Sequence, residues 1–254
     1  MNHNYQGKKV LITGSSRGIG RATAQLFAQA GAQVVIHYHQ NEKAAQEALS
    51  SLIGEGHHIL QADLAVASSV RQLVQDAHAQ LQGLDILVNN AGIFLPHPFE
   101  STPYEEWLDT WQRTINTNLT GAAVAAYTAA EFMKAQGSGK IVNIGSRGAF
   151  RGEAGQPGYG ASKAALHAMG QSLAQALGPH GITVHNVAPG FVETAMARPH
   201  LQGEAGEAVK RQSPLNRVAT VMDVAQAILY LASPEAAFTT GCILDINGAS
   251  YLRT

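Results

Sequence analysis

The sequence has one cysteine, almost no net charge and no long apolar run. Because Cys242 is the only cysteine, an intrachain disulfide is impossible and a zinc site built on thiolates is excluded. We therefore expect a reducing, cytoplasmic compartment. No apolar run reaches the roughly 18 residues of a membrane span, and residues 10–13 are too short a run for a signal-peptide core. We accordingly expect no membrane association.

The charges of the chain nearly cancel. Lys and Arg number 17 against 18 Asp and Glu, which gives a formal charge of -1 and a pI of about 6.8. This balance provides no field that would collect nucleic acid, so we expect no nucleic-acid partner. The 11 histidines include no His-Glu-x-x-His pattern and no matching set of carboxylates, so we expect no metal site.

Short apolar runs alternate with longer segments of helical period, and this alternation is typical of βαβ units. Strands are predicted at 9–13, 33–38, 58–62, 85–90, 140–145, 183–188 and 242–246, and helices at 21–30, 42–53 and about 103–134. Gly31 is suited to end the first helix, Asn41 to cap the second and Gly54 to close it.

The most apolar strands predict burial on both faces, as in a parallel sheet covered by helices. Right-handed crossovers then give an open, doubly wound α/β sheet. We expect a single domain over residues 1–254, since α/β folds of this size routinely form one domain. Ligands in such sheets bind beyond the carboxyl ends of the strands.

The segment from Thr13 to Gly20 follows the first strand directly and opens the first helix. Gly14 permits a tight turn, Gly18 lets a pyrophosphate approach the backbone, and Gly20 allows close packing of the helix on the sheet. The helix N-terminus adds unpaired N–H groups and a positive dipole. The spacing G-x-x-x-G-x-G departs from the usual G-x-G-x-x-G, and an ordinary βα turn is the alternative interpretation.

Tyr159 and Lys163 lie four residues apart in a segment of helical pattern, so they share one helix face. A neighbouring cation favours a phenolate, so Lys163 is expected to lower the pKa of Tyr159 toward neutrality and make it a usable acid or base. Ser146 follows a predicted strand, where its hydroxyl can stabilise charge on a substrate carbonyl oxygen. A solvated helix face is the alternative for an isolated Tyr-x-x-x-Lys pair.

These motifs occur in an order that resembles the short-chain dehydrogenase/reductase family over nearly the whole chain. The group it looks closest to contains 3-oxoacyl-acyl-carrier-protein reductases and related ketone or sugar reductases. The resemblance implies a Rossmann-type fold with seven parallel strands and helices on both faces. The segments that carry it are 13–20, Asn89 to Gly92, Ser146, 159–163 and Pro189-Gly190.

The resemblance also implies residue roles. Asn118, chosen over Asn116, would hold a water in a proton relay with Lys163, Thr194 would hold the carboxamide, and Asp63 with Leu64 would contact the adenine. The catalytic residues would be Asn118, Ser146, Tyr159 and Lys163. The expected cofactor contacts are Gly14, Ser16, Arg17, Gly18, Ile19, Gly20, His39, Asp63, Leu64, Asn90, Ala91, Gly92, Tyr159, Lys163, Pro189, Gly190, Val192 and Thr194.

The expected cofactor is NADP(H). A site selective for NAD places Asp or Glu at the end of the second strand, but residues 35–41 contain no acid and Glu42 already belongs to the next helix. Arg17 could bind the 2′-phosphate across the turn, while His39 or Asn41 could donate further hydrogen bonds.

The sequence thus predicts an NADP(H)-dependent oxidoreductase that transfers hydride between nicotinamide and a carbonyl or secondary alcohol. Two alternatives stay open: a reductase of 3-oxoacyl thioesters, and a dinucleotide sensor without turnover. Residues 193–216, with Pro199 and Pro214, are expected to form a substrate lid. Arg147 or Arg151 is expected to favour anionic substrates. Small residues in 121–130 and 161–170 predict a homo-oligomer, which the family resemblance makes a tetramer.

Overall fold

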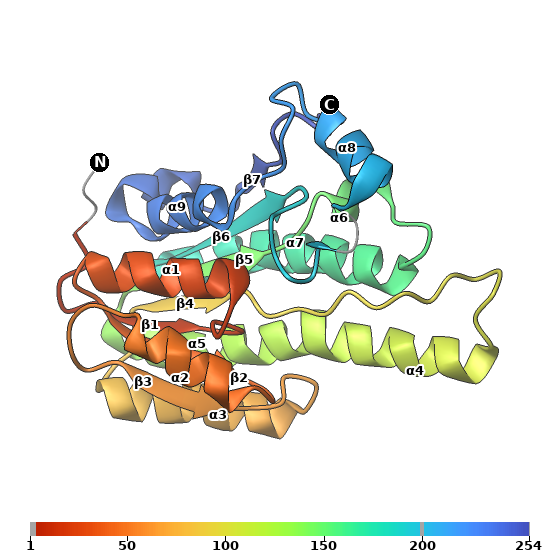
Figure 1. Cartoon of the computed structure of the whole chain (residues 1–254). Coiled ribbons are helices and arrows are strands. Elements are labelled where there is room, and N and C mark those ends of the chain that lie inside the picture. The colour runs from red at the N-terminus through yellow and green to blue at the C-terminus, as the bar shows by residue number, and fades with distance from the viewer. Residues whose placement is uncertain (1–3, 199–200, 254) are drawn as a thin grey trace.

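The computed structural model describes residues 4–198 and 201–253, and it contains a parallel sheet covered by helices on both faces (Figure 1). This arrangement confirms the predicted fold class. In the described residues the sheet has seven strands in the order β3-β2-β1-β4-β5-β6-β7. They are β1 (Lys9–Ile12), β2 (Gln33–Tyr38), β3 (His58–Gln61), β4 (Ile86–Asn89), β5 (Gly139–Ile144), β6 (Ile182–Pro189) and β7 (Ile243–Ile246).

Two helical layers enclose the sheet because successive strand residues point to opposite faces. In β1, Val10 and Ile12 pack into one apolar core, while Leu11 between them packs into the other. The first core is covered by α1 (Gly18–Gln29), α2 (Glu42–Ser50) and α9 (Val221–Ala232). The second is covered by α3 (Ala67–Leu81), α5 (Gly121–Gln136) and α7 (Pro157–Leu177).

The ends of the first two helices differ in part from the prediction. Helix α1 begins at Gly18, three residues before the expected start, so its first turn belongs to the glycine-rich segment. Asn41 caps α2 as predicted, since its side chain accepts a hydrogen bond from the Ala44 N–H at 2.9 Å. The expectation for Gly54 was wrong: α2 ends at Ser50, and Gly54, with a φ of +102°, lies in the loop that follows.

The long helix expected at about 103–134 is divided. It consists of α4 (Tyr104–Ile115), a π-helical turn η1 (Asn116–Thr120) and then α5. Such turns often occur at functional sites, and this one carries the buried Asn118. Residue patterns alone could not separate the three parts, because no glycine or proline interrupts residues 104–120.

The shorter helices are α6 (Gly148–Arg151), η2 (Gly178–His180), α8 (Gly203–Arg211) and η4 (Pro234–Thr239). Two of them, α6 and α8, follow strands β5 and β6, whereas η2 and η4 directly precede β6 and β7. Figure 1 shows α6 and α8 above α7 and shows the start of α4 projecting from the body. The expected lid contains α8, while its residues 199 and 200, including Pro199, lie outside the described residues. Among the helices described, none has the length and apolar character needed to cross a membrane.

Candidate active site

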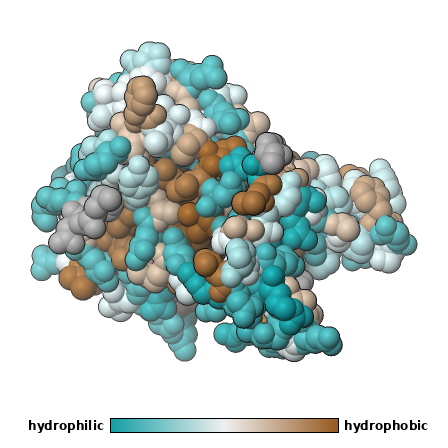
Figure 2. Space-filling model, turned by 90° about the horizontal axis from the view of Figure 1, so that it is seen from above, coloured by the Kyte–Doolittle hydropathy of each residue, from teal (hydrophilic) through white to brown (hydrophobic). Residues whose placement is uncertain are grey.

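A cavity of about 900 Å³ opens at the carboxyl ends of the strands. Its volume is in the range of small-molecule and cofactor sites. Figure 2 shows the molecule from above, with apolar side chains across the middle of the face and hydrophilic ones around them. All the expected site residues line this cavity except Gly20 and Asn118, which lie behind its wall.

The glycine-rich turn fits tightly against β4 and α1. Gly14 and Gly18 have φ values of +64° and +57°, a region that favours glycine. A Cβ on Gly14 would lie 2.9 Å from the Ala91 Cα, and one on Gly20 would lie 2.6 Å from the Gly14 carbonyl oxygen. The turn therefore requires glycine at both positions for reasons of space.

His37 on β2 holds this turn in place, a role that sequence reasoning missed. Its Nδ1 accepts a hydrogen bond from the Gly14 N–H at 2.8 Å, so its Nε2 donates to the Ala62 carbonyl at 3.2 Å. Burial lowers the pKa of His37 to about 4, which keeps the ring neutral as this pattern requires. The available signal was its position inside the apolar run 33–38, which predicts burial.

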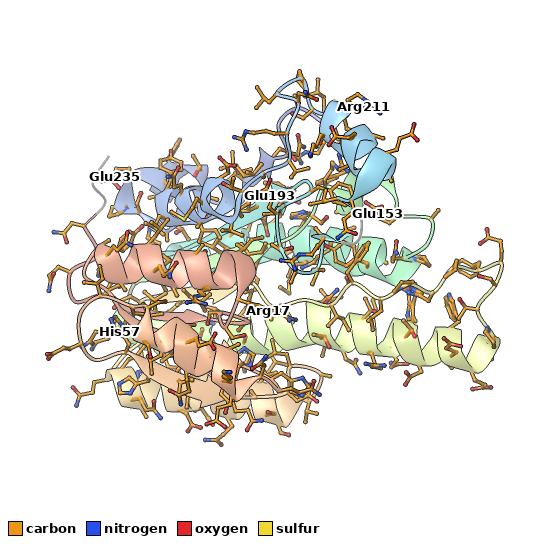
Figure 3. All side chains as sticks on the ribbon, in the orientation of Figure 1. Arg17, His57, Glu153, Glu193, Arg211 and Glu235 are labelled. Atoms are coloured by element: carbon orange, nitrogen blue, oxygen red, sulfur yellow. The ribbon has the colours of Figure 1, made fainter. Side chains whose placement is uncertain are left out.

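The N-terminus of α1 is open to an anion. Arg17 occupies the N-cap in an extended conformation and makes no side-chain cap, and no acidic residue lies in the first turn. The first N–H groups of the helix are therefore left for a ligand beside the cavity. Arg17 is exposed at the cavity wall (Figure 3). These residues fit a dinucleotide, whose pyrophosphate needs such donors and such a close approach.

Just beyond the end of β2, the His39 ring lies near the carboxylate of Asp63, and β2 itself carries no acidic residue. The His39 Nε2 lies 3.7 Å from the Asp63 Oδ2, and both side chains are about half exposed. Asp63 also accepts a hydrogen bond from the Ala65 N–H at 2.9 Å. Asp63 and Leu64 line the cavity next to the end of β2, as expected for a nucleotide-contacting segment.

Ser146, Tyr159 and Lys163 meet at the other end of the cavity. Ser146 follows β5 and accepts a hydrogen bond from the Gly148 N–H at 3.0 Å, and its side chain also hydrogen-bonds Tyr159. The Lys163 Nζ donates to the Ile144 carbonyl at 2.7 Å and lies 5.8 Å from the centre of the Tyr159 ring. The structure therefore brings together the three side chains that the sequence singled out.

The pKa of Tyr159 moves opposite to expectation. Burial raises it, the hydrogen bond from Ser146 offsets part of that rise, and the negative charge of Glu153 adds to it. The expectation that Lys163 would bring this pKa toward neutrality was therefore wrong for this structure. Burial also lowers the pKa of Lys163 to about 8. Desolvation decides both directions because both groups are enclosed.

Asn118 lies beside this group rather than in the cavity wall. Its Oδ1 accepts from the Ile93 N–H at 2.8 Å, and its Nδ2 donates to the Ile93 carbonyl at 3.0 Å. A Cβ on Gly92 would lie 3.3 Å from both the Asn118 Oδ1 and the Lys163 Nζ. The two polar groups therefore border the same small space, which glycine leaves open.

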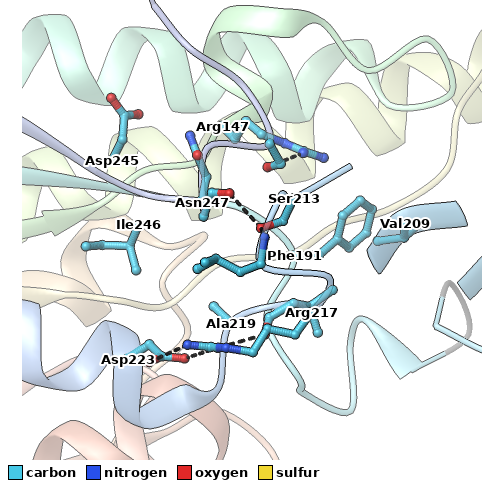
Figure 4. Close-up of a pocket in the computed structure, with 14 residues that line it drawn as sticks. Arg147, Phe191, Val209, Ser213, Arg217, Ala219, Asp223, Asp245, Ile246 and Asn247 are labelled. Carbon is cyan, nitrogen blue, oxygen red and sulfur yellow. Dashed lines mark hydrogen bonds and ion pairs between the residues drawn. The ribbon is translucent and has the colours of Figure 1, made fainter. Parts of the chain in front are cut away.

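The Arg147 side chain is buried and held by hydrogen bonds to other side chains. It is 3% exposed, and its NH1 donates to the Gln212 Oε1 at 3.0 Å and to the Ser250 Oγ at 2.7 Å. The guanidinium also lies 5.3 Å from the centre of the Phe191 ring. These contacts form one side of a second cavity of about 240 Å³ (Figure 4). Arg151 is exposed and donates to the same Gln212 oxygen at 3.3 Å.

Comparisons with known proteins agree with this geometry. Residues 14–249 match the family model described as Enoyl-(Acyl carrier protein) reductase. The 3-oxoacyl-acyl-carrier-protein reductase of Escherichia coli K12 is 37% identical over 249 residues, which are 98% of this chain and 99% of that protein. Nodulation protein G of Rhizobium sp. N33 is 39% identical over 95% of this chain and 96% of its own length.

Solved structures give the same result. A short-chain dehydrogenase from Burkholderia cenocepacia in complex with NADP is 36% identical and superposes with a TM-score of 0.88, covering 97% of this chain and 99% of that one. A short-chain dehydrogenase/reductase of Brucella melitensis, named as a glucose/ribitol dehydrogenase, is 30% identical with a TM-score of 0.90 over the whole of both chains.

Proposed function

The chain belongs to the short-chain dehydrogenase/reductase family, and on that premise we propose that it is an NADP(H)-dependent carbonyl reductase or alcohol dehydrogenase. The observation that carries the proposal is the meeting of Ser146, Tyr159 and Lys163 in the same cavity as the glycine-rich turn. A dinucleotide sensor without turnover would not need this set of three polar side chains beside its cofactor.

The cofactor would be held along the whole cavity. Its pyrophosphate would lie at the N-terminus of α1 beside Gly14 and Gly18, and Asp63 with Leu64 would contact the adenine. Lys163 would bind the nicotinamide ribose and Thr194 the carboxamide. The remaining contacts would come from Ser16, Ile19, Asn90, Ala91, Gly92, Pro189, Gly190 and Val192, all of which line the cavity. When bound, the nicotinamide supplies or accepts the hydride.

NADP(H) is proposed over NAD(H) because of the charges near the end of β2. The strand carries no carboxylate that would bind a ribose 2′-hydroxyl and repel a 2′-phosphate. Arg17 is exposed at the cavity wall with its cation available to a phosphate. His39, which lines the same part of the cavity, would add a hydrogen bond to that phosphate.

Tyr159 would act as the general acid in reduction. Its raised pKa keeps the phenol neutral at pH 7, so it can donate its proton to the oxygen of the carbonyl as negative charge develops there. Ser146 would donate a hydrogen bond to the same oxygen. Lys163 and Asn118, which border the space at Gly92, would return a proton to Tyr159 through water.

A reductase of 3-oxoacyl thioesters is the second candidate. The observation that favours it is the 37% identity over nearly full length to a protein with that name. In either case residues 193–216 would form the lid over the substrate, since Val192, Thr194 and the residues up to Ala197 line the cavity. The single-domain organisation and the cytoplasmic location stay predictions.

We also propose a homotetramer. Helix α7 exposes Ala161, Ala164 and Ala168 at helical spacing, and small side chains let a second helix approach closely. Helix α5 exposes Tyr127 and α4 exposes Tyr104, each more than 60% accessible. A second copy of the chain would cover these surfaces.

The experiment for the catalytic proposal compares the parent with Tyr159→Phe in NADPH oxidation with a panel of ketones, sugars and acyl thioesters. Loss of the transferable proton should lower turnover by at least about a hundredfold, in the range of general acid catalysis. The dissociation constant for NADPH should change little. Activity of the variant within a few-fold of the parent would remove Tyr159 from the reaction.

A further inference from the structure

The charged group beside the reacting tyrosine is a carboxylate. Glu153 lies in the turn before α7 and lines the large cavity together with Ser146 and Tyr159. Figure 3 shows it above α7, at the end of the molecule where α6 lies. Its Cγ and Oε1 are each 3.0 Å from the position that a Cβ on Gly148 would occupy. The absence of a side chain at residue 148 thus leaves room for this carboxylate.

The Glu153 carboxylate has no hydrogen bond or ion pair within residues 4–198 and 201–253. The nearby arginines are engaged elsewhere: Arg147 and Arg151 both donate to the Gln212 Oε1, and Arg147 also donates to the Ser250 Oγ. Arg151 does not line the cavity. Arg147 does line it, but Arg147 is only 3% exposed and its guanidinium is held by Gln212 and Ser250. A substrate bound beside Tyr159 therefore lies near the unpaired carboxylate of Glu153 and not near a free arginine guanidinium.

The negative charge of Glu153 acts electrostatically on the hydroxyl group of Tyr159. Burial is the main cause that raises the pKa of Tyr159, and Glu153 adds to it because its negative charge disfavours the phenolate. Burial and the charge of Arg151 lower the pKa of Arg147, and the negative charge of Glu153 offsets part of that fall without forming an ion pair with it. The same negative charge acts on any charge that a substrate carries close to its carbonyl group.

We infer that Glu153 determines substrate specificity, favouring carbonyl compounds with a hydroxyl or ammonium group beside the carbonyl and disfavouring those with a carboxylate there. This inference rests on the proposed carbonyl reduction. A carboxylate accepts charge-assisted hydrogen bonds from such donors, and it repels a like charge in a partly enclosed site. The inference replaces the expectation that Arg147 or Arg151 selects anionic substrates.

Two pairs of nearly isosteric ketones test it. Acetoacetate and acetoacetamide differ in charge, while hydroxyacetone and butan-2-one differ in one donor. The parent should have a higher kcat/KM for acetoacetamide than for acetoacetate, and for hydroxyacetone than for butan-2-one. In Glu153→Gln the discrimination against acetoacetate should fall about tenfold, the size expected for one partly screened charge pair. The preference for hydroxyacetone should fall less, because glutamine still accepts a neutral hydrogen bond.

The matched control is Glu55→Gln, which makes the same charge change in the exposed loop before β3, at the amino ends of the strands. It should leave both ratios unchanged. Equal ratios in the parent and Glu153→Gln, or a parent that prefers acetoacetate, would overturn the inference while leaving carbonyl reduction intact. If the parent reduces none of the four ketones and no other carbonyl compound with NADPH or NADH, the proposed function itself fails.

Discussion

The buried histidine His167 should make the protein sensitive to acid. It lies one turn beyond Lys163 on α7 and is 2% exposed. In the described part of the chain neither ring nitrogen has a hydrogen-bond partner of normal geometry. Burial and the charge of Lys163 lower the pKa of His167 to about 4, although the Ser146 backbone offsets part of this fall.

The size of the effect follows from the two pKa values. In the unfolded chain the pKa of a histidine is about 6.5, so between pH 6.5 and 4 the unfolded chain binds a proton that the folded chain does not. Each pH unit in this interval lowers the free energy of unfolding by about 1.4 kcal/mol. His167 should therefore remove about 3 kcal/mol of stability as the pH falls from 6.5 to 4, and nothing above pH 6.5.

The substitution His167→Leu should remove this loss. Leucine fills a similar volume against the Phe150 ring, which stacks on His167 with ring centres 5.3 Å apart. Because neither imidazole nitrogen has a hydrogen-bond partner of normal geometry among the described residues, the variant should be at least as stable as the parent at pH 7. Urea unfolding at pH 7 and pH 4.5, followed by tryptophan fluorescence, should give a difference between the two pH values smaller by about 2 to 3 kcal/mol than in the parent.

The exposed His180 provides the control, since His180→Leu should leave the acid dependence as it is in the parent. The reasoning would be refuted by a His167→Leu variant with the same acid dependence as the parent. It would also be refuted by a loss of more than about 2 kcal/mol at pH 7, because that loss would mean that the ring has a partner.

Three further predictions concern the cofactor, the sheet and the assembly. Arg17→Ala should weaken NADPH binding more than NADH binding by about 1.5 to 3 kcal/mol, as for a hydrogen bond to a charged group, and equal losses in the two dissociation constants would contradict this. Asn143→Leu should lower the free energy of unfolding in urea by about 2 to 4 kcal/mol, because the amide of Asn143 accepts from Asn89 and donates to Asn186 on the neighbouring buried strands; an unchanged value would show that this ladder adds nothing. Sedimentation at micromolar concentration should show an oligomer, and only a 26.8 kDa species would exclude one.

The fold was predictable because the sequence repeats a simple physical pattern. The strands are apolar on both faces, as in β1, where Val10 and Leu11 enter different cores. The glycine-rich turn was recognisable for a similar reason, since Gly14 and Gly20 have no room for a side chain. Both features depend on residues that are close together in the sequence, so local patterns were sufficient to find them.

The features that were not predicted depend on contacts between distant residues. The hydrogen bond from Gly14 to His37 joins the glycine-rich turn to β2, and the contact from Arg147 to Gln212 spans 65 positions. The acid strength of Tyr159 depends on how completely the surrounding chain excludes water, which outweighs the Tyr-x-x-x-Lys spacing. No local pattern encodes burial of a polar group to this degree.

The protonation states at the site suit reduction at neutral pH. Because burial raises the pKa of Tyr159, the phenol holds its proton and can donate it. Oxidation of an alcohol would instead require the phenolate, which burial and the nearby charge of Glu153 both disfavour. Lys163, with a pKa of about 8, is still mostly protonated at pH 7 and can replace the proton that Tyr159 loses. The charge of Glu153 would thus act on charged groups of the substrate and would also add to the effect of burial on Tyr159.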